Sequence, residues 1–392
     1  MNRIQSIDLF RGFTIFMMVF VNDLAGVANI PDWMKHKPAD ANAMTFVDVV
    51  FPAFLFIVGM SIPLAIRARE ARGDSFWGVL QHIAIRTAGL LLLGVFLVNS
   101  EEMNAAATLL PARLWNILLF FAALLIWAQY PAAEGRKNYL WRAIRVAGVA
   151  LLFLLWWTYR KGEPGAFTGM TTSWWGILGL IGWAYLLATM VYLLLRENAI
   201  GLLGTMAGFV AIAILLKTEG LELPGLLAWL KGTSGHFIHA SIALAGMSLA
   251  CLFADKNLAQ TPAYRIGWMV VTGLLLFVAG FWLRPFYGIS KIYATPTWAL
   301  YSAAICCEMF ALIYWLIDVK NIRNRAQLLE PAGKNPLLVY LLPFFFYPLM
   351  GEAWLPEAFY SGALGFAKAV AFAVVILWIG SWLTKRGLRL QL

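Results

Sequence analysis

The chain has 392 residues, of which 61% are apolar and 13% are charged, against roughly 45–50% and 25% in soluble domains. Even a large soluble domain leaves about a quarter of its chain's surface in water, so it cannot hide this much apolar surface. The net charge of +10 comes from basic residues scattered through short loops, without the dense patch of a nucleic-acid-binding protein. The composition excludes a soluble enzyme, a disordered chain and a disulfide scaffold, and it indicates a polytopic membrane protein.

Apolar runs that suit a bilayer recur along the whole chain. A hydrocarbon core about 30 Å thick needs about 20 apolar residues per helix, and lipid excludes irregular backbone. We therefore predict an all-α, polytopic transmembrane helical bundle of about 11–12 spans in a single domain, residues 1–392. The count is eleven if the short run 335–350 is re-entrant. The predicted spans are residues 8–28, 46–66, 78–98, 114–130, 142–158, 174–195, 199–216, 237–254, 267–283, 295–318, 335–350 and 362–384.

Lysine and arginine residues orient this array, because cytoplasmic loops carry an excess of them. With twelve spans, one set of loops holds seventeen basic residues and the opposite set holds nine. We therefore predict that both termini are cytoplasmic. Residues 29–45 then lie on the outer face, together with the loops 284–294 and 351–361.

The first span contains polar residues, which are costly in a membrane and so mark candidate functional sites. Asp8 and Arg11 are three residues apart on one helix face and can form an ion pair that anchors the helix. Asn22 lies near the outer boundary, where its carboxamide either caps the helix or orients a group in a site.

The outer segment that follows contains His36 between two lysines, and the second span begins with Asp48. The lysine charges favour a neutral imidazole, and a neutral histidine can act as a general base. A loop histidine is more often an ordinary surface residue, and an aspartate at this position can simply stabilise the helix N-terminus. Both interpretations remain open on these residues alone.

Three later positions are candidates for holding an anionic group. Arg86 lies about eight residues inside the third span, so it must snorkel, pair or line an aqueous cavity. Lys334 and Asn335 introduce the eleventh span from the cytoplasmic side. The three cysteines and four histidines lack the spacing of a metal site, so no metal is predicted.

The order of these residues resembles the opening of the heparan-α-glucosaminide N-acetyltransferase family. The resemblance covers about the first 65 residues, with weaker similarities at Arg86, Thr295-Pro296-Thr-Trp298 and Gly333-Lys-Asn335. Its motifs are Asp8-Leu-Phe-Arg11-Gly12, Phe20-Val-Asn22, Lys35-His36, and Asp48-Val-Val-Phe51-Pro52 followed by Phe56-Ile-Val-Gly59.

The resemblance implies a transmembrane acetyltransferase that takes acetyl groups from cytosolic acetyl-CoA. It would deliver them across the membrane to an extracytoplasmic amino sugar or glycan, such as a terminal glucosamine. It assigns catalysis to His36, supported by Asn22, and we expect Asp48 to orient or stabilise the imidazole. We expect Arg86, Lys334 and Asn335 to hold coenzyme A, because phosphates favour such groups.

The expected location is a bacterial inner membrane. The expected partners are membrane lipid and the glycan acceptor, with a homodimer as a further option and no nucleic acid.

Two other classes of protein fit the composition. A transporter or flippase for a sugar or lipid-linked glycan would line its pathway with the same polar residues, although no convincing internal repeat supports one. A structural or assembly subunit would need no polar cluster. Binding of acetyl-CoA to the purified protein would separate the enzyme from both alternatives. Direct transfer and a route through an acetyl-histidine both fit the sequence.

Overall fold

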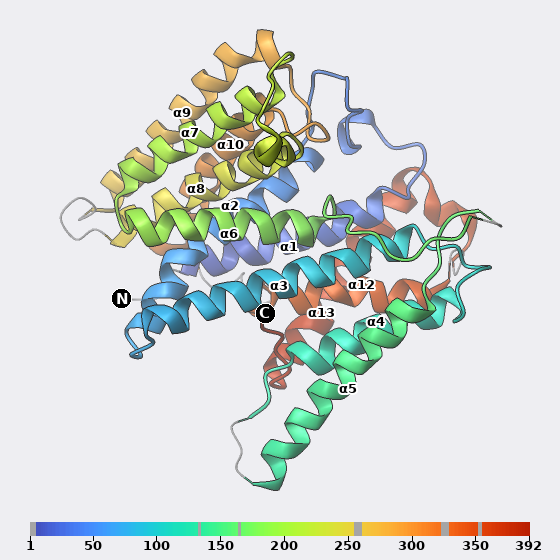
Figure 1. Cartoon of the computed structure of the whole chain (residues 1–392). Coiled ribbons are helices and arrows are strands. Elements are labelled where there is room, and N and C mark those ends of the chain that lie inside the picture. Colours follow the sequence, from blue (N-terminus) through green and yellow to red (C-terminus); the bar gives the residue numbers. More distant parts are fainter. Residues whose placement is uncertain (1–4, 132–134, 164–165, 255–260, 323–328, 352–354) are drawn as a thin grey trace. The chain divides into compact units, whose positions relative to one another are not determined.

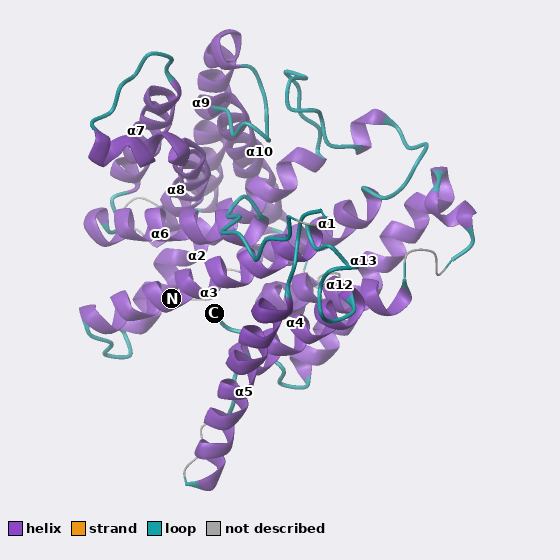
Figure 2. Ribbon diagram, turned by 45° about the vertical axis from the view of Figure 1, so that its right-hand side comes forward, coloured by secondary structure: helices purple, strands orange, loops and turns teal. Residues whose placement is uncertain are grey.

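The structure, a computed structural model, describes residues 5–131, 135–163, 166–254, 261–322, 329–351 and 355–392. These residues form helices and connecting loops (Figures 1 and 2), and the extended contacts among them are isolated bridges rather than strands. The all-α fold class is therefore confirmed.

Twelve described helices of fifteen residues or more coincide with the twelve predicted ranges. They are α1 (Gln5–Leu24), α2 (Val47–Glu70), α3 (Phe76–Glu101), α4 (Ala112–Trp127), α5 (Arg136–Thr158), α6 (Ile177–Leu195), α7 (Ala199–Lys217), α8 (Ser234–Ala254), α9 (Pro262–Tyr287), α10 (Pro296–Tyr314), α12 (Pro336–Met350) and α13 (Gly362–Lys385).

Nine helical segments among the described residues are long and apolar enough to cross a membrane. Two further helices, α4 and α12, are apolar but shorter, with 16 and 15 residues. The first helix, α1, has 20 residues but carries Asp8, Arg11 and Asp23. This pattern is that of a polytopic helical membrane protein.

The predicted ranges differ from the helices mainly at their ends. Several helices extend past their apolar stretch: α5 begins at Arg136 instead of residue 142, and α9 begins at Pro262 instead of residue 267. The side chain of Thr261 caps α9 by accepting from the backbone N–H of Tyr264, which is the usual signal for a helix start. Hydropathy detects only the apolar part of such a helix.

The segment before α12 contains a short helix, α11 (Leu329–Lys334), which includes Pro331 and Gly333. A proline in the first turn of a helix removes no intrahelical hydrogen bond, so this segment can still form one turn. The four remaining short helices are the 3-10 segments Asp32–Met34, Gly225–Thr233 and Glu357–Tyr360, and the π-helical segment Trp315–Val319.

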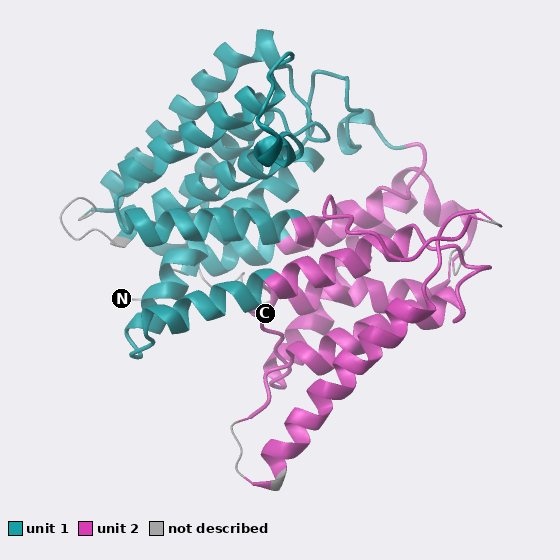
Figure 3. Ribbon diagram, viewed as in Figure 1, with its two compact units in different colours: residues 1–14, 30–87, 180–327 teal, residues 15–29, 88–179, 328–392 magenta. Residues whose placement is uncertain are grey.

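The chain forms two compact units, each assembled from three separate segments (Figure 3). Unit 1 contains residues 1–14, 30–87 and 180–327, and unit 2 contains residues 15–29, 88–179 and 328–392. Helices α1, α3 and α6 each contribute residues to both units.

Unit 1 is built around close packing of α2 against α8. Gly59 on α2 faces the backbone of Ala243, and Gly246 on α8 faces the backbone of Phe56, so a side chain at either glycine would collide with the partner helix. Small residues of this kind let membrane helices approach closely. The Phe10 ring of α1 joins this core by stacking on Phe310 of α10 at 5.8 Å.

Unit 2 pairs α4 with α5 and packs α12 against α4. Trp115 of α4 is fully buried, and its indole N–H donates to the carbonyl of Leu155 on α5 at 3.0 Å. The C-terminal segment returns to this unit, because the backbone N–H of Gln391 donates to the Trp127 carbonyl.

Candidate functional site

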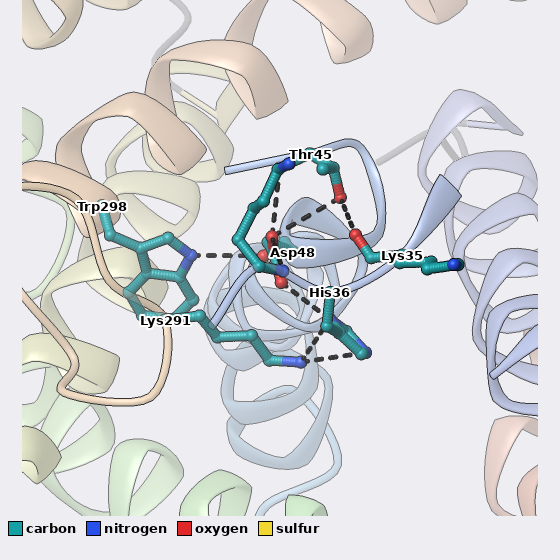
Figure 4. A network of polar contacts seen from close by, with 7 residues as sticks. Lys35, His36, Thr45, Asp48, Lys291 and Trp298 are labelled. Atoms are coloured by element: carbon teal, nitrogen blue, oxygen red, sulfur yellow. Dashed lines mark hydrogen bonds and ion pairs between the residues drawn. The ribbon is translucent and has the colours of Figure 1, made fainter. Parts of the chain in front are cut away.

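His36 and Asp48, which the sequence predicts as site residues, meet at the start of α2 (Figure 4). The Nδ1 atom of His36 lies 2.7 Å from Oδ1 of Asp48. The Asp48 side chain is 2% exposed, whereas the His36 side chain is 41% exposed. A neutral His36 that donates its Nδ1–H to the carboxylate keeps a lone pair on Nε2, which is the atom a general base uses.

The second carboxylate oxygen of Asp48 is held by the loop that precedes α2. It accepts from the backbone N–H of Thr45 at 3.0 Å and of Lys37 at 3.4 Å, and the Thr45 hydroxyl oxygen lies 3.5 Å away. The same hydroxyl contacts the Lys35 carbonyl at 2.9 Å. These bonds fold the loop around the carboxylate and fix the position of His36, so Asp48 acts here as an orienting group.

The backbone of Asp48 is held by a second motif residue. Pro52 lies four residues later in α2 and has no N–H, so the Asp48 carbonyl lacks its usual intrahelical donor. The indole N–H of Trp298, which is fully buried, donates to this carbonyl at 3.2 Å. The hydrogen bond from Trp298 therefore replaces the one that Pro52 cannot donate to Asp48.

Trp298 is itself positioned by the capping of α10. The Thr295 side chain accepts from the backbone N–H of Trp298, and Pro296 occupies the first turn. Both features are typical helix-start chemistry. The His239 ring of α8 packs edge-on against Trp298 at 5.8 Å and against Phe51 at 5.5 Å.

Lys291 completes the cluster, although the sequence gives no reason to single it out. Its Nζ atom lies 3.4 Å from Nδ1 and 3.5 Å from Nε2 of His36 (Figure 4). Burial lowers the pKa of Lys291, and the charge of Asp48 opposes this shift. In the sequence Lys291 is simply a lysine in a short outer loop, and a lysine there does not by itself indicate a functional site.

Asn22 is described in unit 2, whereas His36 and Asp48 belong to unit 1. Its side chain is exposed near the end of α1 and has no hydrogen-bond partner among the described residues. The structure brings together two of the three predicted catalytic residues, and the role of Asn22 stays a prediction.

The expected pair at the start of α1 is present. The Arg11 guanidinium lies 3.3 Å from the Asp8 carboxylate and also donates to the Ser61 hydroxyl on α2 at 2.6 Å. Asp8 is buried and Arg11 is half-buried. This pair links the first two helices within unit 1, in keeping with the anchoring interpretation.

Arg86 is half-buried on α3, ten residues after the helix begins. Its guanidinium carbon lies 4.8 Å from the centre of the Tyr185 ring on α6. Its Nε atom is buried and has no hydrogen-bond partner among the described residues. A buried donor left in this way suits an anionic ligand.

The other two predicted cofactor residues lie in unit 2. Lys334 pairs with Glu330 at 2.6 Å within α11. Asn335 is 1% exposed and holds the C-terminal segment: its amide N–H groups donate to Thr384 and to the Leu388 carbonyl, and its oxygen accepts from the N–H of Leu390. Within the described residues these partners give Asn335 a structural role, and its contact with coenzyme A stays a prediction.

The described residues contain no group of three or more His, Cys, Asp or Glu side chains that could hold a metal ion. The three cysteines are free and buried.

Comparison with known proteins places the chain in a family. The family model described as "Domain of unknown function (DUF5009)" matches residues 3–231. Heparan-alpha-glucosaminide N-acetyltransferase of Homo sapiens is 39% identical over 97 residues, and that of Mus musculus is 38% identical over 98 residues. Each match covers 25% of this chain and 14% of the relative.

The resemblance predicted from the sequence is thus confirmed over part of the chain. Because the family model covers more than half of the 392 residues, the chain belongs to the DUF5009 family.

Proposed function

We propose that this protein is a membrane acetyltransferase that moves an acetyl group from acetyl-CoA to the amine of an extracytoplasmic amino sugar or glycan. The proposal rests on the His36–Asp48 pair, in which a buried carboxylate binds Nδ1 of an imidazole whose side chain is 41% exposed. The names of the two relatives, both heparan-alpha-glucosaminide N-acetyltransferases, supply the reaction class.

His36 acts as the general base in this proposal. Its Nε2 accepts a proton from the acceptor amine while the amine nitrogen attacks the thioester carbonyl carbon, so a C–N bond forms. The C–S bond then breaks, and the same proton passes from Nε2 to the departing sulfur. The products are an amide and free coenzyme A, and the protein returns to its starting state. A positioned acid–base group of this kind contributes about 10²–10⁴-fold to a rate.

Asp48 keeps His36 in the productive tautomer. With the Nδ1 proton held by the carboxylate at 2.7 Å, Nε2 is the nitrogen that is free to accept. The carboxylate also stabilises the imidazolium that exists while the proton is carried. Because its other oxygen is occupied by the loop, Asp48 is not itself available as the base.

The length of α2 supports a reaction that joins two sides of a membrane. Asp48 and Arg67 are nineteen residues apart on this helix, which corresponds to about 28 Å and nearly the thickness of a bilayer core. The Arg67 end carries the basic residues that mark the cytoplasmic side in our topology. His36 then lies at the outer end, where an extracytoplasmic acceptor arrives.

Arg86 is the residue we propose for holding the donor. It lies about 15 Å along α3 from the helix end that our topology places at the cytoplasm, and its buried Nε lacks a partner among the described residues. An arginine in this state suits a phosphate or carbonyl oxygen of acetyl-CoA. Arg86→Ala should weaken acetyl-CoA binding, and an unchanged affinity would remove Arg86 from the site.

Transfer from radiolabelled acetyl-CoA to glucosamine by the purified protein in lipid nanodiscs tests the proposal. The expected result is a labelled amide product that requires both substrates. A protein that binds no acetyl-CoA and instead carries unmodified glucosamine into proteoliposomes would be a transporter, and the proposal would be wrong.

A further inference from the structure

The geometry around His36 points to a further catalytic residue, and we propose that Lys291 is the electrophilic donor of the acyl transfer. In this role its ammonium group donates a hydrogen bond to the thioester carbonyl oxygen and stabilises the negative charge that develops there. The inference rests on the proposed function, because it assigns a role within that reaction.

The position of the ammonium group relative to His36 is the first support. Nζ lies beside the imidazole, 3.4 Å from Nδ1 and 3.5 Å from Nε2, the nitrogen that receives the proton of the attacking amine. With Nδ1 donating to Asp48, Nε2 is the ring atom that can accept from Lys291 or from a substrate. An amine bound at Nε2 brings its target carbonyl next to Nζ, because reacting atoms meet at about 3–3.5 Å.

Among the residues that the structure describes, none forms a direct ion pair that neutralises the charge of Lys291. Within the described residues no carboxylate oxygen lies within 4.0 Å of its Nζ atom, whereas nine other side-chain pairs meet that distance. The nearby Asp48 directs its oxygens to His36 and to the loop before α2. The ammonium group is half-buried and keeps donors for an incoming oxygen.

The loop that carries Lys291 is braced on both sides. The backbone N–H of Ser290 donates to the Thr295 hydroxyl at 3.0 Å, and the N–H of Thr295 donates back to the Ser290 carbonyl at 3.0 Å. Ala294 adopts a left-handed conformation with φ of 45° to close this turn. Non-glycine residues rarely adopt this conformation, so the surrounding hydrogen bonds must impose it.

The same loop is joined to the segment that carries His36. The side-chain oxygen of Asn42 accepts from the N–H of Ile289 at 3.0 Å, and the Arg284 guanidinium donates to the Asn42 carbonyl at 3.2 Å. The base and the ammonium group are therefore fixed on two loops that are hydrogen-bonded to each other. Donors that are fixed before the reaction stabilise a developing charge most effectively.

Lys291 assists the reaction in this role without being consumed. As the amine attacks, the carbonyl π electrons move to oxygen, and the oxygen accepts a hydrogen bond from the ammonium group without taking its proton. When the C–S bond breaks, the carbonyl re-forms and the hydrogen bond weakens. Lys291 begins and ends the cycle as an ammonium group.

The test compares Lys291→Met and Lys291→Arg with wild type and with His36→Ala, all in nanodiscs with acetyl-CoA and glucosamine. Lys231→Met is the matched control, because Lys231 is an exposed lysine of the same unit. Removing a donor to a developing oxyanion typically lowers kcat by about 10²–10³-fold. We expect that loss in Lys291→Met, with the KM for acetyl-CoA changed by less than about threefold.

Lys291→Arg should recover at least about tenfold of the lost rate, because it restores a cationic donor. Size-exclusion profiles and acetyl-CoA binding establish that each variant is folded, and Lys291→Leu, which also lacks a donor, replaces Lys291→Met if the latter does not fold.

A wild-type kcat in folded Lys291→Met, alongside an inactive His36→Ala, would overturn the role of Lys291 and leave the proposed function standing. A raised KM with unchanged kcat would also overturn it, since the lysine would then bind the ground state. If wild type transfers no acetyl group, the proposed function itself fails.

Discussion

At the scale of single residues, the sequence predicts the partners that lie close together in the chain and misses those that lie far apart. Asp8 with Arg11 and His36 with Asp48 are separated by three and twelve residues, and both pairs form. Lys291 is 255 residues from His36, so only the folded chain brings them together. Hydropathy gives no information about such a contact.

Asp48→Asn should lower the transfer rate strongly while the protein still folds. The amide can occupy the same space, but it no longer holds the Nδ1 proton or stabilises imidazolium, and an equivalent change in a serine protease costs about 10⁴-fold. We expect a loss on the order of 10²–10⁴-fold in kcat. Asp32→Asn is the control, because Asp32 is an exposed residue of the same loop with an 87% exposed side chain. Equal rates for both variants would contradict the orienting role.

The pH dependence of transfer should report the charge of Lys291. Burial lowers its pKa from the ordinary value of 10.5, and Asp48 opposes the shift. His36 and His239 are the other titratable groups that interact with it. Because the donor must be protonated, kcat should fall as the pH rises through this lowered pKa. In Lys291→Arg the fall in kcat at alkaline pH should move to higher pH. A fall at the same pH in wild type and in Lys291→Arg would show that another group causes it.

At the scale of elements, helix existence follows from the sequence and helix ends do not. Apolar length predicts all twelve long helices because burial in lipid requires it. The ends depend on local capping, as at Thr261 and Thr295, and on polar turns that continue a helix into water. The motif Thr295-Pro296-Thr-Trp298 is explained by its structure, since capping sets the position of the tryptophan.

Trp298→Phe should destabilise the protein less in a Pro52→Ala background than in wild type. In wild type the substitution leaves the buried Asp48 carbonyl without a donor, which typically costs about 1–3 kcal/mol. In Pro52→Ala the new backbone N–H supplies the intrahelical bond, while the volume lost at the tryptophan is the same. Thermal unfolding of the four proteins in one detergent measures the difference, and equal losses in both backgrounds would contradict the proposed pairing.

At the scale of the whole molecule, the sequence predicts a membrane bundle but not its division into two units. Each unit gathers three segments that are far apart in the chain, and the division depends on which helix faces meet. A hydropathy pattern fixes the length of a span and leaves its neighbours open. The sequence predicts a single domain of residues 1–392 and does not indicate which segments pack together in each unit.

The topology is tested by labelling single cysteines placed at the two ends of α2. Asp40→Cys lies in the exposed loop before the helix, and Ala71→Cys lies directly after it. The three native cysteines are buried and should react little. In intact cells a membrane-impermeant maleimide should label position 40, and position 71 only after permeabilisation. Labelling of position 71 alone in intact cells would invert the predicted orientation.

His36 is the proposed base of the acetyl transfer. The most direct measurement is the rate of acetyl transfer from acetyl-CoA to an amino sugar by purified His36→Ala, compared with wild type and with Asp40→Ala as an exposed control in the same loop. We predict a loss of at least about 10²-fold in His36→Ala, with acetyl-CoA binding and folding retained and with the control at the wild-type rate. A well-folded His36→Ala protein that acetylates the acceptor at the wild-type rate would contradict the account.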